Sequence, residues 1–194
     1  MGRLSEREIV ITAFLEDDLD YDGTALESLW AYRTQGTQGN SLISFVGGCD
    51  IPFENMADLE DVRAQKRIWS PRMLHFIEER FDMDLEKAIL RQRLLAILVQ
   101  EEVSTLSSRK IRREGDDLFD GERKLSISIA TVTPVSTKIH FGINIDRAEG
   151  LDVETEGLST YGVDARTVAE SVLRSYPEEM ESVEDARTRV RGLA

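Results

Sequence analysis

Cysteine and histidine are scarce in this sequence, and it has no long apolar run. The single cysteine, Cys49, cannot form an internal disulfide. The N-terminal stretch MGRLSEREIVITAFLEDD mixes acidic residues into its apolar positions, so we predict neither a signal peptide nor a membrane span. Together these absences favour a cytoplasmic protein that works away from membranes.

Metal-binding and nucleophile patterns are also missing. His75, His140 and Cys49 are too few and too widely spaced for a set of metal ligands, and no C-x-x-C or H-x-x-x-H occurs. The G-x-S-x-G pattern of a nucleophile elbow does not occur either. We therefore predict no structural metal, and we interpret Cys49, in GGCDIP, as a small buried hydrophobic residue.

Positive charge is the next shortage. The 24 lysines and arginines are outnumbered by 37 aspartates and glutamates, which gives a net charge of -13. Such a surface repels phosphate backbones and argues against nucleic acid as the principal ligand. What the chain does have is 194 residues, 41% of them hydrophobic, which is enough for one good core. Without repeats or long linkers, residues 1–194 are predicted to form a single domain.

The order of secondary-structure elements indicates the fold class. Alternating and β-branched residues predict strands at 8–15, 41–48, 73–81, 109–113 and 137–146, with a hairpin at 113–131. Helices are predicted from Thr24, at about 57–68, at 84–105, at 164–176 and at 177–191. Strands and helices are mixed without strict alternation, so we expect an α+β fold with a mixed, mostly antiparallel sheet and helices packed on one face.

Three helices carry specific expectations. The first should begin with a capping box from Thr24 to Glu27 and bury Leu26, Leu29 and Trp30. The last should have Pro177 in its first turn. The helix at 84–105 has the clearest pattern, with Asp84 as its N-cap. Its predicted apolar stripe consists of Leu85, Ala88, Ile89, Gln92, Leu95, Ala96, Val99 and Val103.

Three cations stand together in DVRAQKRI, at positions 61–68 of an otherwise acidic chain. On a helix Arg63 and Arg67 would be four residues apart and would share a face. Two interpretations remain open: an anion site, or a solvated face that pairs with the neighbouring acids. The glycine-rich GTQGN at 36–40 is a weaker candidate for phosphate binding, because it lacks the lysine of a P-loop.

The stretch GDDLFDGERKLSISIA contains two adjacent aspartates, a turn glycine and a lysine before a strand of small and apolar residues. Asp116, Asp117, Gly121 and Lys124 are the members of this pattern. A surface hairpin collects the same residue types, since turns favour Asp and Gly and strand ends favour charge. The second interpretation is the wall of a ligand pocket with Lys124 directed into it.

The pattern resembles the core of the biotin and lipoate protein ligase superfamily. These enzymes carry an Asn-Asp pair, a turn glycine, a lysine, a strand of small residues, and then a strand that ends in G-x-N. Asp116 and Asp117 occupy the positions of the Asn-Asp pair. In IHFGINID, Gly142 and Asn144 match the G-x-N pattern. The resemblance implies a ligase-like fold over about residues 41–146, and an acyl-adenylate made from ATP and a small carboxylic acid.

The resemblance also implies roles for residues. Lys124 would bind the substrate carboxylate and the α-phosphate as a compact positive charge. Asp116 or Asp117 would orient a ribose, an amine or Mg²⁺, while Arg63 or Arg67 would contact phosphate and Asn144 would line the site. Ser126 and Ser128 would let a flat or extended ligand approach the backbone. The acceptor would be a lysine of a carrier protein.

Two features of the ligase superfamily are missing. The glycine- and arginine-rich loop that holds the adenylate has no counterpart except DVRAQKRI. The cysteine that the related octanoyl transferases place before a glycine is replaced by Glu156 before Gly157. The alternative is therefore a non-catalytic ligand-binding or assembly protein that kept the fold and lost the chemistry.

Over the whole chain, the sequence resembles an uncharacterised prokaryotic family called domain of unknown function 366. The segments that carry the resemblance are DYDG, LEDVR, LRQRLL and GDDL. Membership of that family implies no activity. Because open sheets of the ligase superfamily leave an edge that must be covered or paired, we also expect a homodimer.

Overall fold

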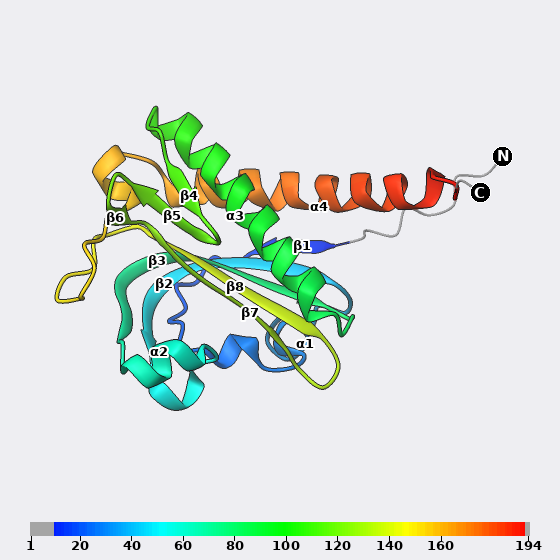
Figure 1. Cartoon of the computed structure of the whole chain (residues 1–194), viewed down its shortest axis with the longest axis horizontal. Coiled ribbons are helices and arrows are strands. Elements are labelled where there is room, and N and C mark those ends of the chain that lie inside the picture. Colours follow the sequence, from blue (N-terminus) through cyan, green and yellow to red (C-terminus); the bar gives the residue numbers. More distant parts are fainter. Residues whose placement is uncertain (1–9, 193–194) are drawn as a thin grey trace.

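The computed structural model describes residues 10–192. Two long helices and a five-stranded sheet form most of the molecule, and a small three-stranded sheet lies beside them (Figure 1). The strands are β1 (Ile11–Phe14), β2 (Ser41–Ile51), β3 (Ile68–Arg80), β4 (Arg112–Glu114), β5 (Asp117–Asp120), β6 (Arg123–Lys124), β7 (Ser126–Val132) and β8 (Thr137–Asn144). The α-helices are α1 (Trp30–Gln35), α2 (Leu59–Ala64), α3 (Leu85–Ser107) and α4 (Ala165–Arg189), with short 3-10 turns η1 (Thr24–Leu26), η2 (Phe53–Asn55) and η3 (Leu158–Tyr161).

The main sheet has the order β1-β2-β3-β8-β7. β1 pairs with β2 in parallel, and the other neighbours are antiparallel, which confirms the predicted mixed, mostly antiparallel sheet. The second sheet has the order β4-β5-β6. The long helices α3 and α4 lie over one face of the main sheet, as expected, while α1 lies on the opposite side (Figure 1).

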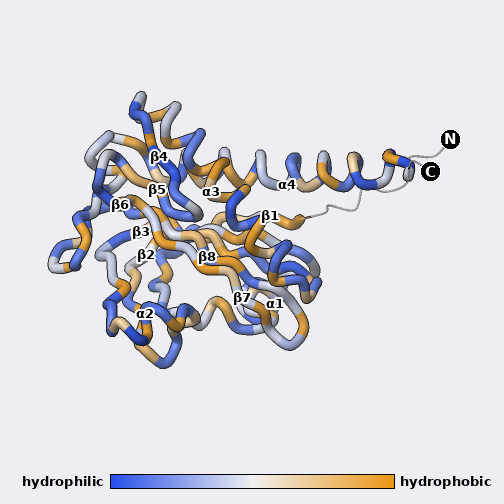
Figure 2. The backbone as a smooth tube through the Cα atoms, viewed as in Figure 1, coloured by the Kyte–Doolittle hydropathy of each residue, from blue (hydrophilic) through white to orange (hydrophobic). Residues whose placement is uncertain are grey.

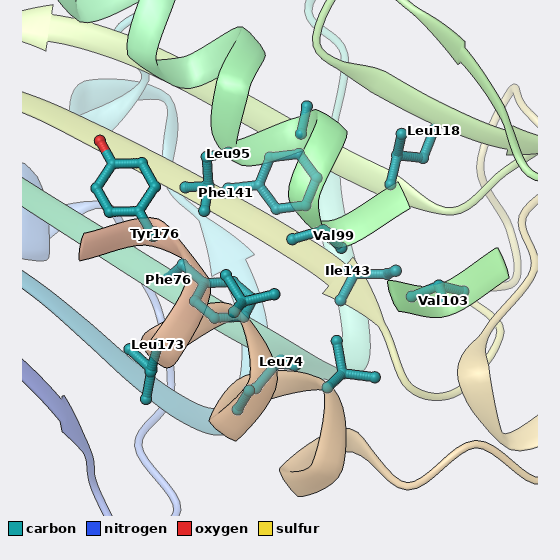
Figure 3. Packing of buried hydrophobic residues seen from close by; sticks show 14 of the residues in the cluster. Leu74, Phe76, Leu95, Val99, Val103, Leu118, Phe141, Ile143, Leu173 and Tyr176 are labelled. Carbon is teal, nitrogen blue, oxygen red and sulfur yellow. The ribbon is translucent and has the colours of Figure 1, made fainter. Parts of the chain in front are cut away.

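The larger core lies between the sheet and the two long helices. Figure 3 shows Phe76 and Phe141 of the sheet meeting Leu95 and Val99 of α3 and Leu173 of α4. Hydrophobic residues also follow the paths of β7 and β8, whereas the loops are mostly hydrophilic (Figure 2). Side chains of this size stabilise a fold by about 1.5 to 3 kcal/mol each when fully buried.

A buried polar cluster ties the two long helices to the sheet. Glu78 of β3 accepts hydrogen bonds from Arg91 Nε of α3, at 3.1 Å, and from the Tyr176 hydroxyl of α4. Arg91 also donates to Asp82 and to Thr137. Burial raises the pKa of the Glu78 carboxyl, and the charge of Arg91 opposes that shift. The hydrogen bonds from Arg91 and Tyr176 compensate for the burial of the Glu78 carboxylate, and they fix the positions of α3 and α4 on β3.

The opposite face of the sheet is covered by the segment from Leu19 to Gln35. Trp30 of α1 packs against Phe45 of β2, and Tyr21 of the same segment is buried against the sheet. Glu79 of β3 accepts the N–H of Leu29 at 2.7 Å and pairs with buried Lys138 of β8 at 3.1 Å. The covering segment is therefore attached by a buried carboxylate as well as by apolar packing.

The N-terminal helix differs from its prediction. Thr24 donates its hydroxyl to Asp22 and starts only the 3-10 turn η1, so the expected capping box with Glu27 is wrong. α1 begins at Trp30, because Leu29 takes a left-handed φ of 61° while its N–H binds Glu79. Trp30 is buried as predicted, but Leu29 is exposed. A tertiary hydrogen bond overrides the local helix signal here.

The C-terminal region is one helix, not two. α4 runs from Ala165 to Arg189 with Pro177 inside it. Proline removes one backbone donor and would ordinarily break a helix. Tyr176 and Met180, on either side of Pro177, are both buried, and their packing holds the helix continuous across it.

The helix expected at 57–68 is shorter, because Gln65 adopts a left-handed φ of 51° and ends α2 at Ala64. Arg67 therefore lies outside the helix and shares no helical face with Arg63. For α3 the predicted N-cap Asp84 is confirmed, since its carboxylate accepts the N–H of Lys87. Most of the predicted stripe is buried, but Leu85 and Ile89 are partly exposed, at 40% and 38%.

The strands agree with prediction in order and differ at their ends. β3 begins at Ile68 and contains Ser70 and Pro71, where a register shift on β2 between Gly47 and Cys49 accommodates the proline. Residues 8 and 9 of the first predicted strand lie outside the described residues. The predicted hairpin at 113–131 divides between the small sheet and β7. Within residues 10–192, no helix is long and apolar enough to cross a membrane.

Candidate functional site around Lys124

Lys124 lies at the point where the small sheet joins the main sheet. The turn before it is made by Gly121, whose φ of 60° suits glycine. The following residue, Leu125, is fully buried in the main core, and Ser126 begins β7. Burial of Leu125 in the core thus anchors the chain immediately after Lys124. This places the Lys124 side chain at the edge of the two sheets.

The Lys124 ammonium pairs with Asp117, another residue of the sequence motif. Its Nζ lies 2.8 Å from Asp117 Oδ2, and both side chains are about one quarter exposed, at 26% and 29%. Burial raises the pKa of the Asp117 carboxyl, and the hydrogen bond from Lys124 opposes that shift. The structure therefore brings together two of the residues singled out from the sequence, in a position that solvent still reaches.

Asp116, the other aspartate of the pair, turns toward α3. Its carboxylate accepts from Gln92 Nε2 at 2.7 Å and forms an ion pair with Arg93. Gln92 also donates to Ser128 of β7 at 2.8 Å. Asp116 thus links the hairpin to α3 and β7, while Asp117 contacts Lys124.

Asn144 lies beside Lys124 at the end of β8. Its Nδ2 is 3.5 Å from the carbonyl oxygen of Lys124, and its backbone N–H donates to the carbonyl of Leu125 at 2.8 Å. Ser126 does not face an open space, because its hydroxyl accepts the N–H of Leu118 at 2.8 Å. The hairpin and the end of β8 are therefore joined by direct hydrogen bonds.

Arg63 and Arg67 lie in a different part of the molecule, next to α2. Arg67 pairs with Asp50 at 3.2 Å and lies over the ring of Trp69, 5.2 Å from its centroid. Arg63 is exposed in the last turn of α2. Among the described residues, no hydrogen bond or ion pair joins either arginine to Lys124 or Asp117.

The two histidines are neighbours, which corrects the prediction that they are scattered. His75 of β3 and His140 of β8 face the side of the sheet covered by Tyr21, with 3.0 Å between His75 Nδ1 and His140 Nε2. The Tyr21 ring stacks on His140 at a centroid distance of 3.8 Å. Sequence spacing could not show this, because adjacent antiparallel strands bring residues 65 positions apart side by side.

Both imidazoles are neutral in this environment. Burial lowers the pKa of His75 to about 4, and burial together with His75 holds the pKa of His140 well below its usual value. Cys49, close to Tyr21 along the sheet, is buried as predicted, and burial raises the pKa of its thiol to about 12. Between residues 10 and 192, no group of three or more His, Cys, Asp or Glu residues is arranged to hold a metal ion.

Two shallow cavities lie at the surface of the described structure. One, of about 390 Å³, lies between the loop after β1 and the start of α4, with Arg72 and Arg166 in its wall. The other, of about 430 Å³, is bounded by Arg123 and the loop from Arg147 to Thr155. Lys124 and Asp117 line neither cavity.

Sequence reasoning missed Arg147 and did not anticipate how Glu156 is used. Glu156 is buried and accepts two hydrogen bonds from Arg147, each 2.6 Å long. In the sequence, Glu156 stands out only as the residue at the place of another family's cysteine. A buried carboxylate in a loop has no periodic signature, so only the fold reveals its partners.

One curated relative and one solved structure are similar to this chain over most of its length. The uncharacterized protein MJ0805 of Methanocaldococcus jannaschii is 36% identical over 185 residues, covering 92% of this chain and 83% of the relative. A protein of unknown function from Pyrococcus horikoshi superimposes with a TM-score of 0.88 and 37% identity, covering 95% of this chain and all of the other.

More distant matches are ligases. A mutant biotin protein ligase from Aquifex aeolicus in complex with biotin has a TM-score of 0.58 and 15% identity, over 90% of this chain and 72% of the ligase. Protein Ta0514, a putative lipoate protein ligase from T. acidophilum with bound lipoic acid, has a TM-score of 0.54 and 15% identity, over 84% and 83%. At this identity the likeness shows the fold alone.

The family model described as domain of unknown function (DUF366) matches residues 10–191, nearly all of the described chain. The ligase-like fold expected from the hairpin motif is thus confirmed by the solved structures. This chain belongs to the DUF366 family, whose fold is that of the biotin and lipoate protein ligases.

Proposed function

We propose that the Lys124 site binds the anionic part of a small molecule: a carboxylic acid, its acyl-adenylate, or ATP. The observation that carries the proposal is the partly exposed ion pair between Lys124 and Asp117. An ammonium has three N–H donors, and Asp117 Oδ2 takes one, so donors remain for a ligand. The ligands of fold neighbours, biotin and lipoic acid, support a small acid as the ligand class.

In the catalytic form of this proposal, a carboxylate oxygen of the acid attacks the α-phosphorus of ATP. A P–O bond forms, and the bond to the departing pyrophosphate breaks. Lys124 would donate hydrogen bonds to oxygens that gain negative charge, and Asp117 would keep the ammonium aligned. A lysine amine of a carrier protein would then take the acyl group and release AMP.

The remaining site residues have secondary roles in this proposal. Asn144 would hold the backbone of Lys124, and Asp116 would fix the hairpin against α3. ATP would arrive with Mg²⁺, which prefers carboxylate and phosphate oxygens, and Asp117 is the carboxylate beside Lys124. Arg63 and Arg67 are exposed cations that would contact phosphate groups of a long ligand.

A non-catalytic function is the second candidate, and a specific observation favours it. Lys124 and Asp117 line neither cavity, and the sheet face next to Asn144 is covered by the segment that contains Tyr21. A protein that binds a nucleotide or an acid without turnover would need no adenylate loop. ATP–pyrophosphate exchange with mixed short- and medium-chain acids separates the candidates, because exchange requires adenylate formation and binding alone gives none.

The test of the site itself is Lys124→Ala, with Lys110→Ala as the control, since Lys110 is an exposed lysine of the same region. Loss of a charge-assisted contact costs about 1.5 to 3 kcal/mol, so ATP affinity should fall roughly ten- to hundredfold. Titration of both variants with ATP, and their thermal melting, give the answer. Unchanged affinity in Lys124→Ala would end the proposal.

We further propose that the protein works as a homodimer. β7 is an edge strand of the main sheet. It pairs with β8 on one side, and no described strand of that sheet pairs with its other side. An open strand edge is a template for pairing with another chain, and a second copy would cover it. A monomeric mass by light scattering at micromolar concentration would contradict the dimer.

A further inference from the structure

We propose that Glu156 is a positioning residue for Lys124. This inference rests on the function proposed for Lys124, and it assigns Glu156 no contact with the ligand. The role follows from two sets of contacts: those of the Lys124 main chain, and those of the Glu156 carboxylate.

The main chain of Lys124 is held by the loop that contains Glu156. β6 is only two residues long, and on one side Lys124 pairs with Phe119 of β5. On the other side its N–H donates to the carbonyl of Glu154 at 2.9 Å, and its carbonyl accepts the N–H of Glu156 at 3.0 Å. So short a strand depends on both neighbours to fix where its side chains point.

The segment 154–156 lies outside the eight strands of the described chain, and the Glu156 carboxylate fixes its position. That carboxylate accepts from Arg147 Nε and Nη2, each at 2.6 Å, from Thr160 Oγ1 at 2.6 Å, and from the N–H of Gly157 at 3.2 Å. It also pairs with Arg123 of β6 at 3.2 Å. One buried carboxylate therefore joins the chain before the segment, the chain after it, and the residue next to Lys124.

Two further observations support a structural use of this carboxylate. Burial would raise the pKa of Glu156, but the hydrogen bonds from Arg147, Thr160 and Gly157 outweigh it and hold the pKa at about 2. Gly157 passes so close to the end of β8 that a Cβ there would lie 2.5 Å from the carbonyl oxygen of Ile145. The segment is thus packed closely against the end of β8 at Gly157. An enclosed carboxylate of such low basicity is a poor general base.

Adjacent cations of β6 therefore have different tasks. Arg123 turns to Glu156 and anchors the strand, while Lys124 turns to Asp117 and stays partly exposed. Breaking the anchor should leave the fold of the main sheet in place and loosen the alignment of the Lys124 amine with Asp117. A displacement of this kind near a binding group has a disproportionate effect on affinity.

The experiment compares Glu156→Gln with Glu154→Gln in the 194-residue chain. Glu154 lies in the same segment, but its side chain is 82% exposed and its ion pair to Arg123 is 3.5 Å long. The readout is the rate at which acetic anhydride modifies Lys124, relative to Lys110 in the same sample, measured by peptide mass spectrometry. The ratio cancels any general loosening of the protein.

Glu156→Gln should raise that ratio by about threefold or more and weaken ATP binding by roughly tenfold, while Glu154→Gln changes neither. An unchanged ratio in Glu156→Gln overturns the positioning role, whatever happens to affinity. If the ratio rises but neither Glu156→Gln nor Lys124→Ala alters ATP binding, the positioning role stands and the proposed function fails. Should Glu156→Gln not fold, Arg147→Lys breaks the same bidentate contact and is read in the same way.

Discussion

The two faces of the main sheet are buried by different means. On the side of α3 and α4, the core is almost wholly apolar, and the charges of its polar cluster around Glu78 are paired. The opposite side carries His75, His140 and the hydroxyl of Tyr21, which has no hydrogen-bond partner among residues 10–192. A thick helical layer permits a dry core, whereas a thin covering segment leaves polar groups trapped beneath it.

The difference shows that a polar group can be buried without having a hydrogen-bond partner. Both faces bury their central side chains, but the helix face provides better partners for the polar groups that it buries. An unpaired buried polar group costs about 1 to 3 kcal/mol. The Tyr21 face is therefore the weaker side of the molecule, and three perturbations sharpen or break this comparison.

Acid should have the largest effect, and it should act on the Tyr21 face. The pKa of His75 is about 4 in the fold, below the unfolded value of 6.5. Its contribution to stability is therefore complete above pH 6.5 and is lost as the pH falls toward 4, by about 3 kcal/mol at pH 4. Urea denaturation between pH 7 and pH 4 measures the slope.

His75→Gln is the control for that slope, because Glu78 has a raised pKa and titrates with the opposite sign. The variant should lose stability less steeply than the original chain over the same pH range. Equal slopes in the two proteins would show that His75 does not govern the acid response.

Removing one hydroxyl from each face gives the next effect. Tyr176→Phe deletes the hydroxyl bonded to Glu78 and should cost about 2 kcal/mol of unfolding free energy, since the acceptor is a buried carboxylate. Tyr21→Phe deletes a hydroxyl that has no partner within the described chain and should be neutral or stabilising, by up to about 1 kcal/mol. Chemical denaturation of the pair tests the comparison directly, and equal losses would abolish it.

A substitution on the surface should have the smallest effect on the free energy of unfolding. Arg67→Ala removes an exposed pair with Asp50 and should change the unfolding free energy by less than about 0.5 kcal/mol. Titration of this variant with ATP decides whether Arg67 contacts phosphate: a severalfold loss of affinity would support that role. The matching variant Asp50→Asn removes the same pair without removing the cation.

Where periodicity is long, the sequence predicted the fold well. Helix α3, with its N-cap Asp84, and the order of the strands followed from local patterns that the packing reinforces. Local patterns gave the wrong helix boundary where a contact with a distant residue determines the backbone conformation. Leu29 left the helix because its N–H binds Glu79, 50 residues away, and α4 continued through Pro177 because the residues around it are buried.

The candidate site shows the same division. The motif from Asp116 to Lys124 lies within one hairpin, so its residues could be grouped from the sequence, and Lys124 does contact Asp117. The neighbours that come from far along the chain, Arg147 and Glu156, could not be grouped in this way. The shared helical face of Arg63 and Arg67 failed for a local reason, the left-handed turn at Gln65.

The packing of β1 against α4 has a consequence for the making of the protein. Phe14 packs into the core beside α4, and Arg166 reaches back over 150 residues to Glu16, at 2.6 Å, while lying 5.0 Å above the Phe14 ring. On the ribosome the first strand emerges long before this helix exists. The partners of Phe14 and Glu16 on α4 are therefore absent until α4 itself has been translated.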